Sequence, residues 1–273
     1  MTGPDDLPLF VINLDRSPER LARFLADNAM PGLAITRLAG VDGRTIDRDS
    51  LIRDGLMAAD LRHADNVLGC SLSHVACWKL VAQGDRPVVI CEDDAVLRRD
   101  FVGLHRHLQT AVATADIVFW SCNLDMHVAI EMPGLGEATL MFDDAMLSSE
   151  DGIRAFQNQR SATVLYRLRR VWGAAVYTVT PQGARRLLER VLPLRNGSGD
   201  ISYPTGDGRL WHMHFDSWGI DMDIGLVHVH DINGMIAVPP VALGRNDKAE
   251  SNIGGQRLIA PSTEPALTAA GAP

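Results

Sequence analysis

The stretch Pro87-Val88-Val89-Ile90-Cys91, followed at once by Glu92-Asp93-Asp94, decides the fold class of this chain. A continuous apolar run of this kind is typical of a buried strand in a parallel sheet. Open α/β sheets bind their ligands outside the carboxyl ends of such strands, where the three acidic residues stand. Adjacent carboxylates repel one another unless a cation offsets them, and Mg²⁺ and Mn²⁺ prefer carboxylate oxygens. We therefore predict a divalent-metal site at Glu92, Asp93 and Asp94 that holds a diphosphate; the alternative is a solvated turn or a helix cap.

Strands and helices alternate on both sides of this stretch. Leu9 to Leu14 is another apolar run, and Ser17, Pro18 and Glu19 then supply the cap, the proline and the acidic residue of a helix start. Further strands are predicted over Ile35 to Ala39, Ile117 to Trp120, Val171 to Val179 and Ile236 to Val238. Further helices are predicted over Cys70 to Gln83, with Gly69 marking the start, and over about Phe101 to Val112. Another is predicted over Thr180 to about Val191, where Thr180 and Pro181 again supply the cap and the proline. The alternation predicts an α/β fold with a largely parallel central sheet flanked by helices.

The predicted organisation is one domain over residues 1–256 with a tail over residues 257–273. Residues 124–170 break the alternation with glycines and polar runs, so we interpret them as a variable insert, a long loop near the site. Residues 195–209 are rich in Gly, Ser, Asp and Pro and are predicted to be loop. The tail has the composition of a disordered segment.

Composition and charge exclude several classes of protein. The formal net charge is −8, which argues against general nucleic-acid binding, since that activity leaves a basic footprint. The four cysteines form no Cys-x-x-Cys pair, so a zinc ribbon or a thioredoxin motif is excluded, and we expect four reduced, buried thiols in a cytoplasmic protein. Neither a signal peptide nor a run of about 20 apolar residues is present, so contact with a membrane would be peripheral at most, at its inner face.

Four motifs in order carry a resemblance to a known family. They are Phe10 to Arg20 (FVINLDRSPER), Gly69 to His74 (GCSLSH) with Trp78, Val88 to Asp94, and Gly173 to Val179 followed by Thr180 to Leu188. Together they resemble glycosyltransferase family 25, which includes bacterial lipooligosaccharide galactosyltransferases and procollagen galactosyltransferases. Asp221 to Asp223 and Pro239-Pro240 fit the family more loosely, and the resemblance covers about residues 8 to 255.

The resemblance implies a GT-A-like fold and a metal-dependent hexosyltransferase that inverts the anomeric carbon. The donor would be a UDP-sugar, commonly UDP-galactose, the cofactor Mn²⁺ or Mg²⁺, and the acceptor a cell-surface glycan or glycolipid such as lipopolysaccharide. Glu92, Asp93 and Asp94 would take the place of the DxD-type element, with Asp93 also placed to contact ribose or phosphate. The nucleotide would lie near Asn13 to Arg16 and Arg20, and Ser73 and His74 would belong to the donor site.

An inverting transfer also needs a group that takes the proton from the acceptor hydroxyl. Asp221 is our choice, because it best fits the C-terminal aspartate of the family; Asp223 and Asp216 are the other candidates, and an aspartate at a helix start can also act as a cap. His212 and His214 form one His-x-His pair, and His228 and His230 form another. On a strand the two side chains of a pair would point to the same side and could bind a metal ion; the alternative is that they are surface histidines.

Two competing functions remain open from the sequence. A metal-dependent phosphohydrolase or nucleotidyltransferase would use the same carboxylates, although no Gly-x-x-x-x-Gly-Lys phosphate loop is present. A non-catalytic relative that binds a sugar nucleotide would keep the acidic triplet without turnover.

Overall fold

A nine-stranded sheet forms the centre of the computed structural model, which describes residues 6–204, 209–216 and 219–245. The strand order is β2-β1-β3-β9-β5-β12-β8-β6-β7. In that order the strands are Leu33–Ala39, Leu7–Asn13, Val88–Glu92, Val176–Val179, Ile117–Phe119, Gly234–Val238, Val164–Arg170, Val128–Met132 and Gly136–Leu140. The predicted tail over 257–273 lies outside the described residues.

The sheet mixes parallel and antiparallel neighbours. β1 lies parallel to both β2 and β3, and β5 lies parallel to β12. β9 is inserted antiparallel between β3 and β5, and β8, β6 and β7 continue the sheet in antiparallel pairs. The predicted α/β domain with a central sheet flanked by helices is confirmed, and its parallel part β2-β1-β3 is the part that carries the acidic triplet.

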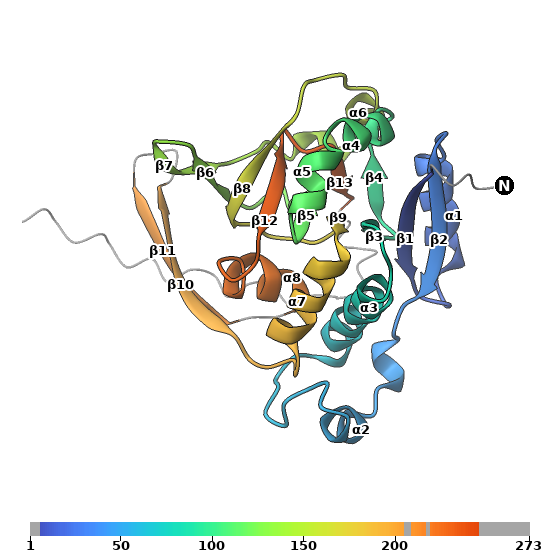
Figure 1. Ribbon diagram of the computed structural model, residues 1–273, viewed down its shortest axis with the longest axis vertical. Coiled ribbons are helices and arrows are strands. Elements are labelled where there is room, and N and C mark those ends of the chain that lie inside the picture. Colours follow the sequence, from blue (N-terminus) through green and yellow to red (C-terminus); the bar gives the residue numbers. More distant parts are fainter. Residues whose placement is uncertain (1–5, 205–208, 217–218, 246–273) are drawn as a thin grey trace, which may run out of the picture.

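Helices cover both faces of the sheet (Figure 1). The helices are α1 Pro18–Asn28, α2 Arg48–Arg53, α3 Asp65–Ala82, α4 Phe101–His107, α5 Gln109–Thr114, α6 Glu150–Gln157, α7 Pro181–Val191 and the single turn α8 Ile220–Met222. Short 3-10 turns lie at Gly43–Thr45 (η1) and Ala145–Ser148 (η2), and a π turn lies at Asp223–Val227 (η3). Core residues of α3 and α7 pack on one face, and core residues of α1, α4 and α5 pack on the other.

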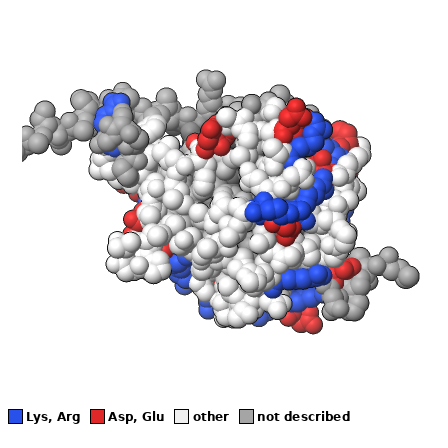
Figure 2. Space-filling model, turned by 90° about the horizontal axis from the view of Figure 1, so that it is seen from above, with Lys and Arg blue, Asp and Glu red and all other residues white. Residues whose placement is uncertain are grey.

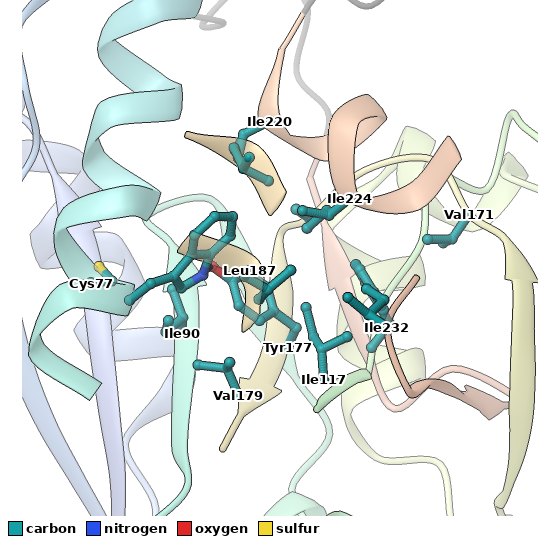
Figure 3. Close-up of a cluster of buried hydrophobic side chains, with 14 of the residues drawn as sticks. Cys77, Ile90, Ile117, Val171, Tyr177, Val179, Leu187, Ile220, Ile224 and Ile232 are labelled. Carbon is teal, nitrogen blue, oxygen red and sulfur yellow. Dashed lines mark hydrogen bonds between the residues drawn. The ribbon is translucent and has the colours of Figure 1, made fainter. Parts of the chain in front are cut away.

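Strand β3 shows why its sequence is apolar without alternation. Val88 and Ile90 contribute to the core beneath α3 and α7, whereas Val89 and Cys91 contribute to the core beneath α1 and α4. Successive side chains of a strand point to opposite faces, so a strand covered on both sides needs apolar residues at every position. Figure 3 shows the first of these cores, with Ile90 beside Tyr177 and Val179 of β9.

The two predicted helix caps differ in outcome. Thr180 caps α7 as expected, because its Oγ1 accepts a hydrogen bond from the backbone N–H of Gly183 at 3.0 Å. Ser17 occupies the N-cap position of α1, but its side chain makes no capping hydrogen bond, so that part of the prediction is wrong. Gly183 has a packing role, since a Cβ there would lie 1.9 Å from the carbonyl oxygen of Asp116.

Two segments interpreted as loops are ordered structure. Residues 124–170 supply β6, β7, α6 and β8, so this segment adds three strands to the central sheet instead of forming a long loop. Within 195–209, Ser198–Pro204 is strand β10, which pairs antiparallel with β11 (Leu210–Asp216) in a hairpin at the opposite end of the molecule from β1 and β2 (Figure 1). β4 (Ala95–Leu97) and β13 (Ala242–Gly244) form a further two-stranded sheet.

Three predicted elements have different boundaries. α3 begins at Asp65, so Gly69 lies inside the helix and does not mark its start. The helix expected over Phe101 to Val112 is divided at Leu108 into α4 and α5. The strand expected from Val171 begins only at Val176. None of the described helices is long and apolar enough to cross a membrane, and on the face drawn in Figure 2 basic and acidic side chains lie close together.

Candidate active site

A pocket opens at the carboxyl ends of the three parallel strands β1, β2 and β3. The residues after β2, the turn η1 and the N-terminal half of α3 complete its wall. Strands β1 and β3 are neighbours in the sheet, and α3 packs beside them (Figure 1). The charged residues of the lining are Arg16, Arg20, Asp42, Arg44, Asp65, Glu92, Asp93 and Asp94. The topology therefore places the predicted acidic triplet in the pocket with three arginines.

Asp93, the middle residue of the triplet, is held by the protein itself. Its Oδ1 accepts a hydrogen bond from Nε of Arg20 at 2.7 Å, and its Oδ2 accepts one from Nδ2 of Asn13 at 2.7 Å. Asn13 is 2% exposed, and its Oδ1 accepts a hydrogen bond from Nε of Arg37 at 3.0 Å. Asn13 and Asp93, both predicted to contact the donor, are thus engaged first with each other and with arginines.

Glu92 and Asp94 are less fully paired than Asp93, although Oδ2 of Asp94 lies 3.9 Å from Nη2 of Arg20. Oδ1 of Asp94 is buried and has no hydrogen-bond partner. Burial, and then the negative charge of Glu92, raises the pKa of Asp94 to about 7. Burial alone would raise the pKa of Glu92, but the His74 imidazole and the Arg20 guanidinium hold it below its usual value. Two close carboxylates, one with an orphaned oxygen, fit a divalent cation, which would offset their repulsion.

His74, on α3, lies at the base of the pocket beside Glu92 at the end of β3. Its side chain is 1% exposed, and its Nδ1 is hydrogen-bonded to the hydroxyl of Tyr177 at 2.8 Å. Nε1 of Trp78 donates to the same hydroxyl at 2.9 Å. The other ring nitrogen, Nε2, lies 3.6 Å from Oε1 of Glu92 and has no hydrogen-bond partner. His74 therefore has a fixed orientation with one nitrogen directed towards the triplet.

Ser73 and two glycines shape the wall of the pocket. The Ser73 hydroxyl accepts a hydrogen bond from the backbone N–H of Val41 at 2.8 Å and donates to the carbonyl of Gly69 at 2.7 Å. A Cβ at Gly69 would lie 2.5 Å from the Val41 carbonyl oxygen, and a Cβ at Gly43 would lie 2.3 Å from the Asp65 carbonyl oxygen. These contacts hold the segment after β2 against α3, so Ser73 shapes the predicted donor site through the backbone.

Arg16 and Arg44 converge on Asp42 at the rim of the pocket. Nε of Arg16 lies 3.2 Å from Oδ2 of Asp42, and Nε of Arg44 donates to Oδ1 of Asp42 at 3.0 Å. The hydrogen bonds from Arg44 are the largest influence and hold the pKa of Asp42 well below its usual range. Two guanidinium groups are thus placed at the rim, in the region where Arg16 was predicted to face phosphate.

Asp221, on α8, lies close enough to Glu92 and His74 for their charges to act on its carboxylate, although α8 is far from β3 in the sequence. Burial, and then the charge of Glu92, raises the pKa of Asp221, while the backbone N–H groups of Met222 and Gly173 hydrogen-bond the carboxylate and oppose that rise. Gly173 has a φ of +84°, and a Cβ there would lie 2.1 Å from Oδ1 of Asn123. The Gly173 motif therefore contributes a backbone donor to the candidate base.

The other sequence candidates lie apart from the triplet in their described contacts. Asp216 lies 3.7 Å from Arg62, and Asp223 is buried in η3. His212 and His214 do point to one side of β11, but they pair across the hairpin with Ser202 and Asp200. His228 and His230 follow η3 in a turn and are not on a strand, so the expectation of a strand pair fails there.

Sequence reasoning missed Cys70, Tyr177 and Arg44 as residues of this region. Cys70 precedes His74 by one helical turn and lines the pocket, half-buried, whereas Cys77, Cys91 and Cys122 are buried as expected. The i, i+4 spacing of Cys70 and His74 was a usable signal. Tyr177 gave no such signal, because it meets His74 only through the pairing of β9 with β3.

The sequence of this chain matches that of a known protein family. The sequence model described as "Glycosyltransferase family 25 (LPS biosynthesis protein)" matches residues 6–201 of the chain. The chain belongs to glycosyltransferase family 25. The match includes β1, α3, β3 and the Gly173 motif, and ends before Asp221. Membership supports glycosyltransferase activity in general.

Curated family 25 relatives match this chain over part of their length. A rat protein named "Probable inactive glycosyltransferase 25 family member 3" is 30% identical over 146 residues, which cover 46% of this chain and 25% of the rat protein. An Aedes aegypti "Glycosyltransferase 25 family member" is 34% identical over 95 residues, which cover 32% of this chain and 16% of that protein. The chain therefore spans a quarter or less of the curated relatives it matches.

A solved structure from Entamoeba histolytica, described as a "putative UDP-N-acetylglucosamine pyrophosphorylase", matches with a TM-score of 0.28 and 11% identity. The matched region covers 83% of this chain and 57% of the Entamoeba chain. A likeness this low carries no inference about the fold or the substrate.

Proposed function

We propose that this family 25 member is a metal-dependent, inverting hexosyltransferase that moves a sugar, galactose by expectation, from a UDP-sugar to a cell-surface glycan such as lipopolysaccharide. The observation that carries the proposal is the orphaned, buried Oδ1 of Asp94 beside Glu92, in a pocket that also presents arginines. Acidic ligands for a cation and basic ligands for phosphate in one pocket suit a nucleoside diphosphate donor.

Glu92 and Asp94 are the residues that would hold Mn²⁺ or Mg²⁺. Both residues line the pocket, whereas the carboxylate of Asp93 is engaged by Arg20 and Asn13. A bound divalent ion would neutralise charge on the departing diphosphate. Asp93, which the sequence also suggested as a ligand, is proposed instead to fix the backbone that carries the other two carboxylates.

The donor nucleotide is proposed to bind over the segment after β2, between the triplet and the arginines of the rim. Arg16 and Arg44 supply guanidinium groups that suit phosphate oxygens. Asn13 and Ser73 support the donor from beneath, because their polar atoms are already engaged within the protein, and His74 lies beneath the triplet with its Nδ1 held by the Tyr177 hydroxyl. Nucleotide and metal would then meet at the carboxyl ends of β1 and β3.

Asp221 is proposed as the general base of a single displacement. It would accept the proton of the acceptor hydroxyl while that oxygen attacks the anomeric carbon and the nucleoside diphosphate leaves. Its raised pKa makes it a better proton acceptor than an ordinary aspartate, and two backbone N–H groups fix its orientation. The acceptor would approach from the side of α8, and the enzyme would work in the cytoplasm, at most peripherally at the inner face of the membrane.

A non-catalytic sugar-nucleotide-binding protein is the second candidate, because the rat relative is named as inactive. Such a protein would keep the metal-dependent binding of the donor without transfer. Membership of a glycosyltransferase family speaks against the phosphohydrolase or nucleotidyltransferase alternative.

Thermal unfolding with a panel of UDP- and GDP-sugars, each with and without Mn²⁺, tests the donor half of the proposal. A rise in Tm that needs both Mn²⁺ and a UDP-sugar is expected, and Asp94→Asn should abolish it. Asp151→Asn is the control, because Asp151 is an exposed carboxylate on α6 outside the pocket. The absence of a Tm shift with every sugar nucleotide would refute donor binding. A second assay measures UDP release: release that requires an added glycan acceptor would identify an enzyme, and its absence would identify a binding protein.

A further inference from the structure

Three potential metal ligands of different chemistry converge at the base of the pocket. Cys70 and His74 lie one turn apart on α3, and Glu92 ends β3 beside them. One ligand atom from each, a thiol sulfur, an imidazole nitrogen and a carboxylate oxygen, lies within 4.8 Å of the other two. A tetrahedral ion with bond lengths of about 2.0–2.3 Å sets its ligands roughly 3.3–3.8 Å apart, so small side-chain rotations would close this set.

His74 is the second and independent sign of a ligand. Its side chain is 1% exposed, and yet Nε2 has no hydrogen-bond partner. The nearest acceptor, Oε1 of Glu92, is 3.6 Å away, which is too long for a hydrogen bond. A buried polar atom without a partner is rare, and an ion that binds Nε2 would satisfy it.

The surroundings of His74 match those of metal-binding histidines. Such residues have their second ring nitrogen held by an outer partner, which fixes the ring. Here Nδ1 is held by the Tyr177 hydroxyl, whose oxygen also accepts the Trp78 indole N–H. Glu92 is 31% exposed at its side chain and opens to the pocket, so an ion has a route in and a fourth ligand position is open to solvent.

We propose that Cys70 Sγ, His74 Nε2 and a Glu92 carboxylate oxygen form a three-ligand site for a borderline transition-metal ion such as Zn²⁺. Thiolate and imidazole favour such ions over Mg²⁺. The site does not depend on the proposed sugar transfer. It shares Glu92 with the proposed Mn²⁺ or Mg²⁺ site at Glu92 and Asp94, so the two ions would compete for that carboxylate.

Titration of the metal-free protein with Co²⁺, without any nucleotide, tests the site directly. Co²⁺ replaces Zn²⁺ in such sites and reports a thiolate ligand through a charge-transfer band in the near ultraviolet. We expect that band at one equivalent, its loss on adding Zn²⁺, and its absence in Cys70→Ala. Cys77→Ala is the matched control, because Cys77 is a buried cysteine on the same helix that faces the core, and it should keep the band.

Two further measurements keep the test decisive if Cys70→Ala does not fold. Alkylation of Cys70 in the wild-type chain can be measured by peptide mass spectrometry. One equivalent of Zn²⁺ should slow this alkylation, whereas excess Mg²⁺ should not. Tyr177→Phe, which removes the outer partner of His74, should weaken Co²⁺ binding by about 10-fold. Absence of the band in the wild type, its survival in Cys70→Ala, or unchanged alkylation with Zn²⁺ would overturn the proposal. Because no sugar nucleotide is used, these results are independent of whether the chain binds a donor.

Discussion

Arg20 and Asp93 form a nearly enclosed ion pair that joins α1 to the residue after β3. Nε of Arg20 lies 2.7 Å from Oδ1 of Asp93, and the two side chains are 12% and 8% exposed. Arg20 thus hydrogen-bonds only the central carboxylate of the acidic triplet and lies farther from Asp94, at 3.9 Å from its Oδ2. The pair also ties the first motif of the chain to the third, which are separated by 73 residues.

Removing one member of this pair should be costly. Arg20→Met is expected to lower the free energy of unfolding by about 3 kcal/mol, because it leaves a buried carboxylate without its cation. The double variant Arg20→Met/Asp93→Asn should recover part of that loss, which urea unfolding would measure. Arg154→Met, which removes an exposed ion pair with Asp151, should change stability by less than about 1 kcal/mol. Additive effects of the two substitutions would show that the pair is not coupled.

Gly69 should tolerate no side chain, although it lies in a helix where alanine is normally preferred. Gly69→Ala places a Cβ 2.5 Å from the Val41 carbonyl oxygen and 2.9 Å from the Gly43 backbone nitrogen. We expect a loss of about 2 kcal/mol and a weaker Tm shift with the donor, because the wall of the pocket must move. Gly103→Ala in α4 is the control: no atom would lie within 4 Å of its Cβ, so it should gain up to about 1 kcal/mol. Equal effects of the two substitutions would contradict the packing role of Gly69.

The pKa of Asp94 implies a specific dependence of stability on pH. That pKa is raised to about 7, whereas an unfolded aspartate titrates near about 3.9. Between these values the folded state binds more protons than the unfolded state, so this residue's contribution to stability is present at low pH and is lost as pH rises towards 7. Asp94→Asn should therefore stabilise the metal-free protein at pH 8 but have little effect at pH 4, as measured by urea unfolding at each pH.

The same experiment has an internal check. Added Mn²⁺ should stabilise the wild type at pH 8 and remove the advantage of Asp94→Asn, because the ion binds the ionised carboxylate. An Asp94→Asn variant that is less stable than the metal-free wild type at pH 8 would show that Asp94 is not strained by its neighbours.

The parts of this structure that the sequence predicted are those governed by local chemistry. The apolar run before Glu92 specified a strand buried on both faces, and Thr180-Pro181 specified a helix start. The hairpin β10–β11 was missed because its Gly, Ser and Pro content is typical of loops, and pairing between its strands overrides that content. Gly69 was interpreted as a helix start, although its role is a close contact with a distant backbone.

For the site, the sequence supplied the residue types but not their partners. Asp93 was predicted as a ligand because it stands between two other carboxylates, yet its contacts with Arg20 and Asn13 depend on how α1 and β1 pack beside β3. His74 and Tyr177 are 103 residues apart and meet only because β9 enters the sheet next to β3. Contacts of this kind are set by topology, which local patterns do not encode.

Asp221 allows the sharpest test of the proposed chemistry, since the family match ends before it and its position rests on the fold. Asp221→Asn keeps the size of the side chain but removes its basicity, so kcat should fall by about 10²–10⁴-fold while the Tm shift with Mn²⁺ and the UDP-sugar remains. Asp216→Asn is the control, because Asp216 is the last residue of β11 and lies beside Arg62, and it should leave kcat unchanged.

The pH profile of Asp221 distinguishes a base from a residue that only positions the substrate. Burial and the charge of Glu92 raise its pKa, so the acid limb of the wild-type kcat should lie above the range of an ordinary aspartate, with activity lost as the carboxylate is protonated. Asp221→Asn should lose that limb along with the rate. A variant that keeps both the wild-type kcat and the limb would require another base, and the loss of donor binding in Asp221→Asn would instead place Asp221 in the donor site.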